Sequence, residues 1–448
     1  MDVNLVDRRA AVERIDCDLL VVGAGAAGLA AAVTAARAGL SVTLLEKYGF
    51  AGGGAVAGLS GTVCGMYLAS EDNGRRPEQV VFGFADEFVR ILEDRGGITP
   101  PAKYGLTYTR VHDPLVWRET ADAMLREVGV DVIYHSLAIG LNGDLGENVE
   151  GVLAYTKGGT IDIRAEIVID ASGDADILAM AGLDTFIGEE GRVQNPTMIF
   201  RLMGVDVDQF RAEYGPDTIM PPVVSEAIMA ADRDGSFDLP RKKVWLFPTV
   251  REGELLCNCT RIVGPDGREL NTLFRRDFTD AEIEGRRQAR QYAAFFTRHL
   301  VGCEDSYLDD TAPQVGVRQT RQGRGTARLQ NSDVVSGTKF ADGIARSPWP
   351  IELHAGDRPK VEWLLDDYYE IPWGCFVPAH GEGLLFAGRC LSAEHEAVAS
   401  ARVTAQCFSY GQAAGMAASI AVRNRIPVRQ IEGWEVRAAL NQAGACLS

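Results

Sequence analysis

The first part of the chain alternates short apolar runs with a helix-like pattern. Residues 18–23 (DLLVVG) form an apolar run that ends in glycine, and residues 24–39 are rich in alanine and end at Gly39. Residues 41–46 (SVTLLE) form a second apolar run. Short apolar runs are typical of buried strands, and a terminal glycine is typical of a helix end. The opening of the chain therefore predicts a strand–helix–strand unit.

The chain continues with mixed elements up to about residue 190. Glycines crowd residues 49–65, which predicts irregular structure there. Apolar residues at helical spacing predict helices over 77–94 and 113–128. His112, just before the second helix, is interpreted as structural. The pattern also predicts a strand over 130–135, a hairpin over 149–156 and 160–164 with a glycine turn, and a buried strand over 166–171.

The pattern changes after about residue 194. Strands are predicted over 197–204, 243–248 and 255–263, and a polar helix over 279–300. Residues 348–378 are rich in Trp, Tyr and Pro and favour loops and short strands, before a strand over 383–387 and a helix over 402–423. We therefore predict an α/β fold whose first domain is split in sequence, 1–190 and 375–448. A mixed α+β lobe for substrate, 191–374, is inserted between the two parts.

Composition and charge exclude several classes of protein. The 448 residues carry 45 Lys and Arg against 62 Asp and Glu, a net charge of −17, which disfavours nucleic-acid binding. Nine cysteines without a C-x-x-C pair favour neither a disulfide framework nor a metal site. The N-terminal residues are polar, and no uninterrupted apolar stretch is long enough to insert into a membrane. These features predict a cytoplasmic enzyme without a metal.

A glycine fingerprint joins the first strand to the first helix. Gly23, Gly25 and Gly28 form G-x-G-x-x-G, with Ala26 and Ala27 between the last two glycines. The first glycine allows a tight turn, the second lets the backbone approach a pyrophosphate, and the third lets helix and strand pack closely. Glu46 ends the second strand, where an acid can accept hydrogen bonds from ribose hydroxyls. This arrangement predicts a dinucleotide site.

The segments after the fingerprint favour FAD over a nicotinamide cofactor. The second strand runs into Lys47 and then into Gly52, Gly53 and Gly54, a loop over which a long extended ligand can pass. Residues 167–176 (IVIDASGDAD) form a buried strand that ends in the small residues Ala171, Ser172 and Gly173. Small residues let a strand end approach a cofactor closely.

Eight segments, in order, resemble FAD-dependent oxidoreductases with an FAD domain of the glutathione-reductase type. Within that superfamily the chain is most similar to a bacterial family related to the flavoprotein subunits of fumarate reductase and succinate dehydrogenase. The segments are VVGAGAAGLAAA (21–32), EKYGFAGGGAVAG (46–58), VIDASGDADILAMAG (168–182), QNPTMIFRL (194–202), APQVGVRQTRQGRG (312–325), IPWGCFVP (371–378), GLLFAGRCLSAEHEAVASARV (383–403) and GQAAGMAA (411–418). The resemblance implies a split Rossmann-like FAD-binding domain and a redox reaction, and it leaves the substrate open.

FAD is expected to contact the fingerprint, the end of the second strand and the small-residue turns, together with four residues from later segments. These residues are Gly23, Gly25, Ala26, Ala27, Gly28, Glu46, Lys47, Gly52, Gly53, Gly54, Ala138, Ala171, Ser172, Gly173, Gly388, Arg389 and Val403. For Arg389, pairing with a surface acid is the alternative. Some relatives link FAD covalently through a histidine in the loop after the second strand, but residues 48–58 contain none, so FAD is expected to bind non-covalently. Cys64 could attach to the flavin, or it is an inert core thiol. The chain lacks a second G-x-G-x-x-G and paired redox cysteines, which disfavours a built-in NAD(P)H domain.

His395 and Arg402 are the predicted catalytic residues. The resemblance favours His395 as a proton donor or acceptor, with a structural role as the alternative. Arg402 is expected to begin the last long helix, where it would stabilise negative charge on the reduced flavin or clamp a substrate carboxylate. Most of Arg318, Arg321 and Arg324 are expected to pair at the domain interface, with one of them reaching the site as the alternative. Aromatic residues of 349–373 either wall a substrate pocket or fill the core.

The leading hypothesis is an FAD-dependent oxidoreductase that transfers a hydride between a small organic substrate and flavin N5. Electrons would then pass to oxygen, a quinone or a redox protein, and the reverse direction, reduction of an activated double bond, is equally compatible with these residues. The alternatives are a flavin monooxygenase that uses external NAD(P)H and oxygen, and a non-catalytic FAD-binding subunit. A homo-oligomer is possible.

Overall fold

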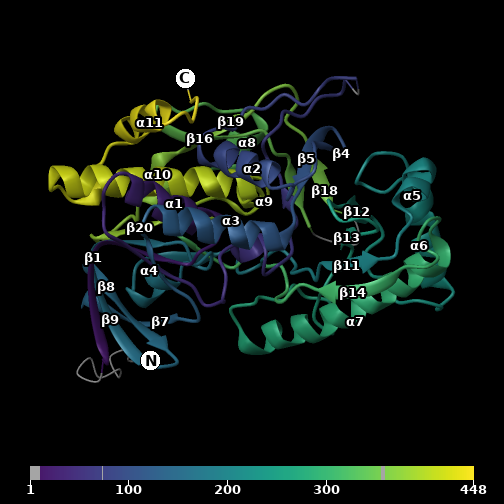
Figure 1. The fold of residues 1–448 in the computed structure, drawn as a ribbon, viewed down its shortest axis with the longest axis horizontal. Coiled ribbons are helices and arrows are strands. Elements are labelled where there is room, and N and C mark those ends of the chain that lie inside the picture. The colour runs from purple at the N-terminus through teal and green to yellow at the C-terminus, as the bar shows by residue number, and fades with distance from the viewer. Residues whose placement is uncertain (1–10, 73, 355–358, 448) are drawn as a thin grey trace.

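A seven-stranded sheet forms the centre of the larger lobe (Figure 1). The computed structural model describes residues 11–72, 74–354 and 359–447. The sheet order is β6-β2-β1-β9-β8-β7, and β20 also pairs with β9. The strands are β1 (Glu13–Val22), β2 (Val42–Leu45), β6 (Asp131–Ile133), β7 (Leu137–Asp144), β8 (Asn148–Thr156), β9 (Gly159–Asp170) and β20 (Leu384–Phe386).

Strand β9 belongs to two kinds of pairing at once. Its first half pairs antiparallel with β8, and its last residues pair parallel with β20, while β1 pairs parallel with it along nearly its whole length. The sequence pattern predicted two separate strands, 160–164 and 166–171, which was wrong. Strand β9 has no break because β1 begins at Glu13, five residues before its predicted start. Residues 13–17 of β1 pair with residues 161–165 of β9 and so continue the parallel ladder.

Two alanine-rich helices pack against each other beside the sheet: α1 (Ala26–Arg37) and α10 (Thr404–Asn424) (Figure 1). A Cβ at Gly411 would lie 1.9 Å from the Ala27 carbonyl oxygen, and one at Gly415 would lie 2.5 Å from the Ala31 carbonyl oxygen. Only glycine permits backbones to approach this closely. The longer helices α2 (Phe84–Asp94), α3 (Pro114–Glu127) and α11 (Gly433–Gln442) also belong to this lobe.

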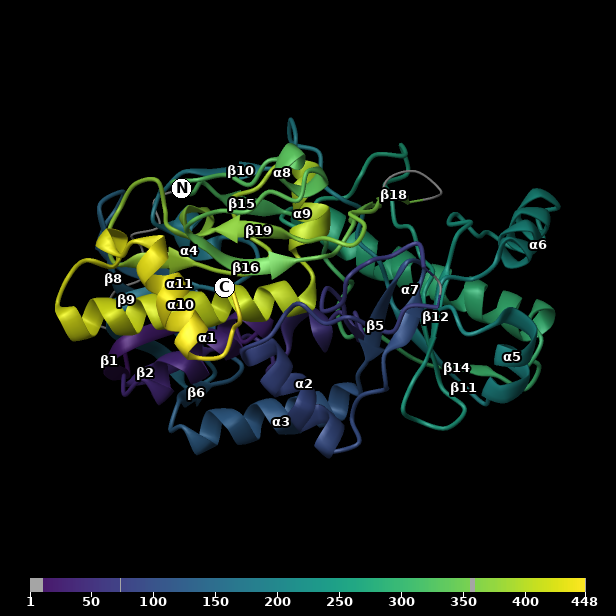
Figure 2. The ribbon, with the colours of Figure 1, turned by 90° about the horizontal axis from the view of Figure 1, so that it is seen from above.

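A second lobe is built on an antiparallel sheet of order β12-β13-β11-β14. The long helix α7 (Arg275–His299) lies beside this sheet, with the short helices α5 (Val207–Tyr214) and α6 (Pro222–Arg233) at the end distant from the larger lobe (Figure 2). The four strands are β11 (Phe200–Met203), β12 (Trp245–Pro248), β13 (Leu255–Asn258) and β14 (Tyr307–Thr311). This arrangement confirms the predicted α/β fold with an inserted mixed lobe. The domain boundaries near 190 and 375 stay predictions.

Shorter strands and helices complete the fold. The strands are β3 (Thr62–Val63), β4 (Ala102–Tyr104), β5 (Thr107–Val111), β10 (Thr185–Ile187), β15 (Arg321–Gly323), β16 (Gly343–Ser347), β17 (Ile351–Leu353), β18 (Lys360–Glu362) and β19 (Tyr369–Pro372). The helices are α4 (Asp176–Met180), α8 (Asn331–Val335) and α9 (His395–Ala401). In the described part of the chain, no helix has both the length and the apolar character that crossing a bilayer requires.

The predicted helix over 402–423 does not begin at Arg402. Helix α9 ends at Ala401 with Arg402 as its C-cap, and Val403 has extended backbone angles before α10 starts at Thr404. Tertiary contact stabilises this break, because the Ala405 N–H, in the first turn of α10, donates to the Cys64 carbonyl oxygen at 3.3 Å. Arg402 therefore lies in a short connection between two helices.

Candidate functional site

One elongated cavity starts at the N-terminus of α1 and extends to the second lobe. Every residue predicted to contact the cofactor lines it except Gly28: Gly23, Gly25, Ala26, Ala27, Glu46, Lys47, Gly52, Gly53, Gly54, Ala138, Ala171, Ser172, Gly173, Gly388, Arg389 and Val403. Their role in binding FAD stays a prediction. The fold nevertheless brings segments from the whole length of the chain to one surface.

The three fingerprint glycines have different surroundings. Gly23 has a φ of +101°, and a Cβ there would lie 2.5 Å from the Ala171 carbonyl oxygen. A Cβ at Gly28 would lie 1.7 Å from the Gly23 carbonyl oxygen, so Gly28 serves the packing of α1. At Gly25, by contrast, the nearest atom to a Cβ would be the Gly53 Cα, 3.8 Å away. The cavity therefore opens beside Gly25, where the free N–H groups of α1 begin.

Glu46 holds a carboxylate at the cavity wall, at the end of β2. Its Oε2 accepts a hydrogen bond from the Ala24 N–H at 2.7 Å, and its Oε1 accepts one from the Tyr48 N–H at 2.9 Å. Burial raises the pKa of Glu46. The two backbone donors fix the position of the carboxylate and leave lone pairs for a further donor, such as a ribose hydroxyl.

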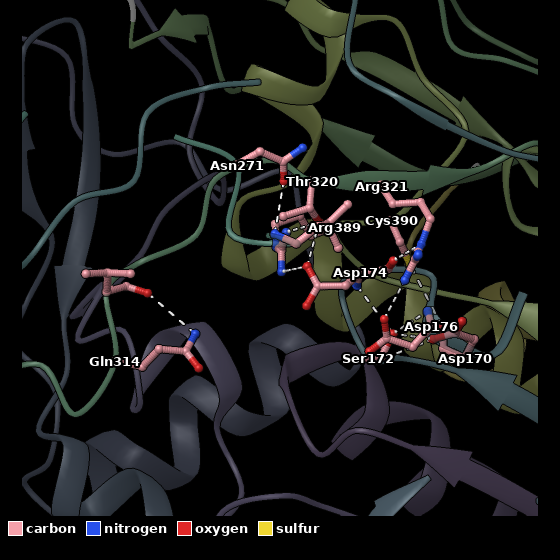
Figure 3. A network of polar contacts seen from close by, with 12 residues as sticks. Asp170, Ser172, Asp174, Asp176, Asn271, Gln314, Thr320, Arg321, Arg389 and Cys390 are labelled. Carbon is pink, nitrogen blue, oxygen red and sulfur yellow. Dashed lines mark hydrogen bonds and ion pairs between the residues drawn. The ribbon is translucent and has the colours of Figure 1, made fainter. Parts of the chain in front are cut away.

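A polar network lies at the carboxyl end of β9 and in the turn that follows it (Figure 3). Arg389 donates from Nη2 to Asp174 Oδ1 at 2.9 Å and from Nη1 to Thr320 Oγ1 at 3.1 Å. Burial by itself would raise the pKa of Asp174, but the charge of Arg389 and the bond from Thr320 outweigh it and lower the pKa. Arg389 thus pairs with an acid while also lining the cavity. The acid is largely buried and not on the surface, and the contact of Arg389 with FAD stays a prediction.

The far end of the cavity carries excess positive charge. Arg318 and Arg402 line it, and Arg241 lies directly behind. Among the described residues, the hydrogen-bond partners of these guanidinium groups are neutral. Burial lowers the pKa of Arg402 to about 10, and burial together with the other two arginines lowers that of Arg318 well below its ordinary value. Buried cations of this kind need an anionic partner.

A small acid–base group faces these arginines. Tyr104 donates from its hydroxyl to both carboxylate oxygens of Glu352, at 2.8 and 3.0 Å. His354 Nε2 lies 3.7 Å from Glu352 Oε1, and its Nδ1 lies 3.5 Å from Arg241 Nη2. Burial, followed by the nearby arginines, lowers the pKa of His354 well below its ordinary value. His354 is therefore neutral, with Nδ1 facing a donor and the proton on Nε2.

The structure places the predicted catalytic residues differently. Arg402 lines the cavity, whereas His395 does not. His395 lies at the start of α9, half-buried beside Gly188. The histidine at the cavity wall is His354. The sequence analysis did not identify His354 or Glu352 as site residues. The signal was the pattern Glu-x-His at the end of β17, because residues two apart on a strand share one face.

Cys64 also lines the cavity. It lies within hydrogen-bonding distance of Thr62 Oγ1, at 3.2 Å, and of Thr109 Oγ1, at 3.3 Å. Burial raises the pKa of its thiol to about 12. Because the thiolate is the reactive form of cysteine, burial disfavours a reaction of Cys64. This observation favours a non-covalent cofactor, which stays a prediction.

The cavity residues fit an extended dinucleotide. Open backbone at Gly25 and the free N–H groups of α1 suit a pyrophosphate, and the fixed carboxylate of Glu46 suits a ribose. From this end the cavity continues past Gly388 to the arginine-rich end. If the pyrophosphate and the ribose bind near α1, the arginine-rich end is left for the redox-active ring of the cofactor and for the substrate.

Comparisons with known proteins agree with this fit. The family model described as FAD dependent oxidoreductase matches residues 18–440. The chain is 31% identical to digeranylgeranylglycerophospholipid reductase 1 of Methanococcoides burtonii over 203 residues, 43% of this chain and 46% of that protein. It is 66% identical to urocanate reductase of Eggerthella lenta over 38 residues, 8% of this chain and 6% of that protein. The matches thus span less than half of each of these curated relatives.

Among solved structures, the chain is similar to a geranylgeranyl bacteriochlorophyll reductase-like protein from Thermoplasma acidophilum. The identity is 16%, the TM-score 0.47, and the match covers 96% of this chain and 83% of that one. The family match extends over nearly the whole chain and includes both parts of the split sheet and the lobe between them. The chain therefore belongs to the FAD-dependent oxidoreductase family.

Proposed function

We propose that this enzyme transfers a hydride between a small organic anion, held at the arginine-rich end of the cavity, and its FAD cofactor. Family membership confirms FAD and an enzymatic role, which excludes the non-catalytic alternative. The observation that carries the proposal is the charge imbalance at this end. Among the described residues, Glu352 is the carboxylate that faces Arg241, Arg318 and Arg402 there. A substrate carboxylate, or a comparable anion, would balance the charge.

The bound cofactor supplies two-electron chemistry, because a flavin ring can accept or return a hydride. The residues of the chain supply binding, orientation and proton transfer. Arg318 and Arg402 would bind the anionic group of the substrate, since guanidinium groups pair with carboxylates in a fixed geometry. Tyr104 holds a proton on Oη, and Glu352 orients that hydroxyl. The Tyr104 hydroxyl would exchange this proton with the substrate as the hydride moves.

The names of the sequence relatives favour the reductive direction. The relatives in M. burtonii and E. lenta are both named as reductases. In that direction the substrate would carry an activated double bond, and the chain would supply the proton that accompanies the hydride.

Binding of short carboxylates tests the proposal. FAD-loaded protein would be titrated with propionate, crotonate, succinate and fumarate while the flavin absorbance is recorded. We expect a saturable spectral change with at least one of them. Arg318→Met should weaken this binding by roughly 10- to 100-fold, because a hydrogen bond to a charged group contributes about 1.5–3 kcal/mol. Arg290→Met is the matched control, since Arg290 is exposed on α7.

Two results would contradict the proposal. One is the absence of any spectral or calorimetric response to all four acids. The other is equal affinity in the Arg318→Met and Arg290→Met variants, which would show that the buried guanidinium does not contact the anion. In either case the charge imbalance would need another explanation.

A further inference from the structure

A second cavity of about 650 Å³ lies beside the arginine-rich end, within the second lobe. Its walls come from the turn between β4 and β5, the segment before α6, one face of α6, and residues around β12 and β18. A cavity of this size is in the range of small-molecule sites. Nothing in the proposed hydride transfer uses it.

The walls of the second cavity are mainly apolar. Ile219, Met220, Met229, Trp245 and Trp363 line it, and the charged residues Glu226, Lys243 and Glu352 line it as well. The one acid on the segment before α6, Asp217, is already engaged, because its carboxylate accepts hydrogen bonds from the Gly105 N–H at 3.1 Å and the Ile219 N–H at 2.9 Å. An apolar wall of this kind gains free energy when a hydrocarbon group replaces water.

The two cavities share part of one wall. Tyr104 and Glu352 line both of them. The hydrogen bond between these side chains therefore lies at the junction of the arginine-rich end with the apolar cavity. Trp245, which lines the apolar cavity, has its ring 6.5 Å from that of Tyr104. The buried pair of Tyr104 and Glu352 separates the two cavities, so a molecule bound to Arg318 would reach the apolar space where these two side chains move aside.

We propose that the second cavity binds an apolar substituent of the substrate whose anionic group binds Arg318 and Arg402. This inference rests on the proposed function and narrows its substrate class to amphipathic organic acids. The shared wall places the two cavities side by side, and the positive and apolar ends match the two parts of such a molecule. Tyr104 and Glu352 then contact the substrate between its charged and apolar parts.

A chain-length series tests this assignment. FAD-loaded protein would be titrated with straight-chain monocarboxylates from propionate to decanoate, with affinity measured by flavin absorbance and by calorimetry. If the substituent enters the apolar cavity, each added methylene should lower the Kd by up to about fourfold. Met229→Asp, which places a charge on the cavity wall, should flatten this dependence.

A control residue lies on the same helix. Val223 is 58% exposed on α6 and does not line the cavity, so Val223→Asp should keep the full chain-length dependence. Trp363→Ala serves as a second variant in case Met229→Asp does not fold. It removes apolar contact area without adding charge and should lower the gain for each methylene.

The outcomes separate the two proposals. An affinity that does not change with chain length, while short acids still bind through Arg318, overturns the apolar site and leaves the proposed function standing. The opposite outcome is that no acid changes the flavin absorbance, while 1-octanol still binds. Its binding would be followed by tryptophan fluorescence and would be lost in Met229→Asp. That result supports the apolar site and refutes the anion site.

Discussion

Gly25→Ala tests whether the N-terminus of α1 holds the pyrophosphate of FAD. Gly25 precedes α1 with φ −67° and ψ −175°, angles that alanine adopts without strain. The added methyl group would lie 3.8 Å from its nearest neighbour, an ordinary contact. The change should therefore alter the free energy of unfolding of the apoprotein by about 1 kcal/mol or less. The methyl group would instead occupy the space through which a phosphate approaches the backbone.

The expected loss of FAD affinity can be derived from these contacts. Displacing the pyrophosphate from charge-assisted bonds to backbone N–H groups costs about 1.5–3 kcal/mol, or roughly a 10- to 100-fold higher Kd. Apoprotein would be titrated with FAD by quenching of flavin fluorescence, and unfolding would be followed in parallel. Gly158→Ala is the matched control, because a Cβ there also has its nearest neighbour at 3.8 Å but lies far from the cavity, in the β8–β9 turn. Unchanged affinity in a folded Gly25→Ala variant would refute the assignment of the pyrophosphate site.

Two further predictions concern stability. Burial lowers the pKa of His112 from 6.5 to about 4, so the unfolded state binds more protons between these values and stability falls as the pH drops through this window, by up to about 3 kcal/mol. Urea unfolding at pH 7.5 and pH 5 measures this loss of stability, which His112→Phe should abolish. His380 is exposed, so the control variant His380→Phe should retain the loss. An equal pH dependence of both variants would contradict the role of His112. Gly411→Ala should destabilise the protein by about 1–3 kcal/mol or more in thermal unfolding, because the methyl group would overlap the Ala27 carbonyl oxygen, and an unchanged Tm would disprove the close packing of α1 on α10.

Local signals were sufficient for the first strand–helix–strand unit. The fingerprint glycines, the cap at Gly39 and the acid at Glu46 lie within one short segment, and each fixes the backbone near itself. The structure differs by only a few residues at the ends of α1 and β2. The cavity residues of this unit could therefore be predicted from the sequence.

Features that depend on distant contacts could not be predicted. The break between α9 and α10 has no glycine or proline to mark it, and it arises where Ala405 meets the backbone of Cys64. His395 is near Arg402 in sequence, but α9 carries it away from the cavity. Glu352 and His354 reach the cavity because β17 packs against α9 and pairs with β18, both of which are distant from the fingerprint in sequence. Alternation of residues on a strand was the one local sign of this pair.

The position of β20 has a consequence for synthesis on the ribosome. The last residues of β9, 168–170, pair with β20 on one side, yet β20 begins only at Leu384. At translation rates of about 5–20 residues per second, that edge of β9 stays without its partner for on the order of ten to forty seconds. An apolar strand edge exposed for so long invites pairing with other nascent chains. Slower elongation between Asp170 and Leu384 should therefore increase aggregation of this protein during expression.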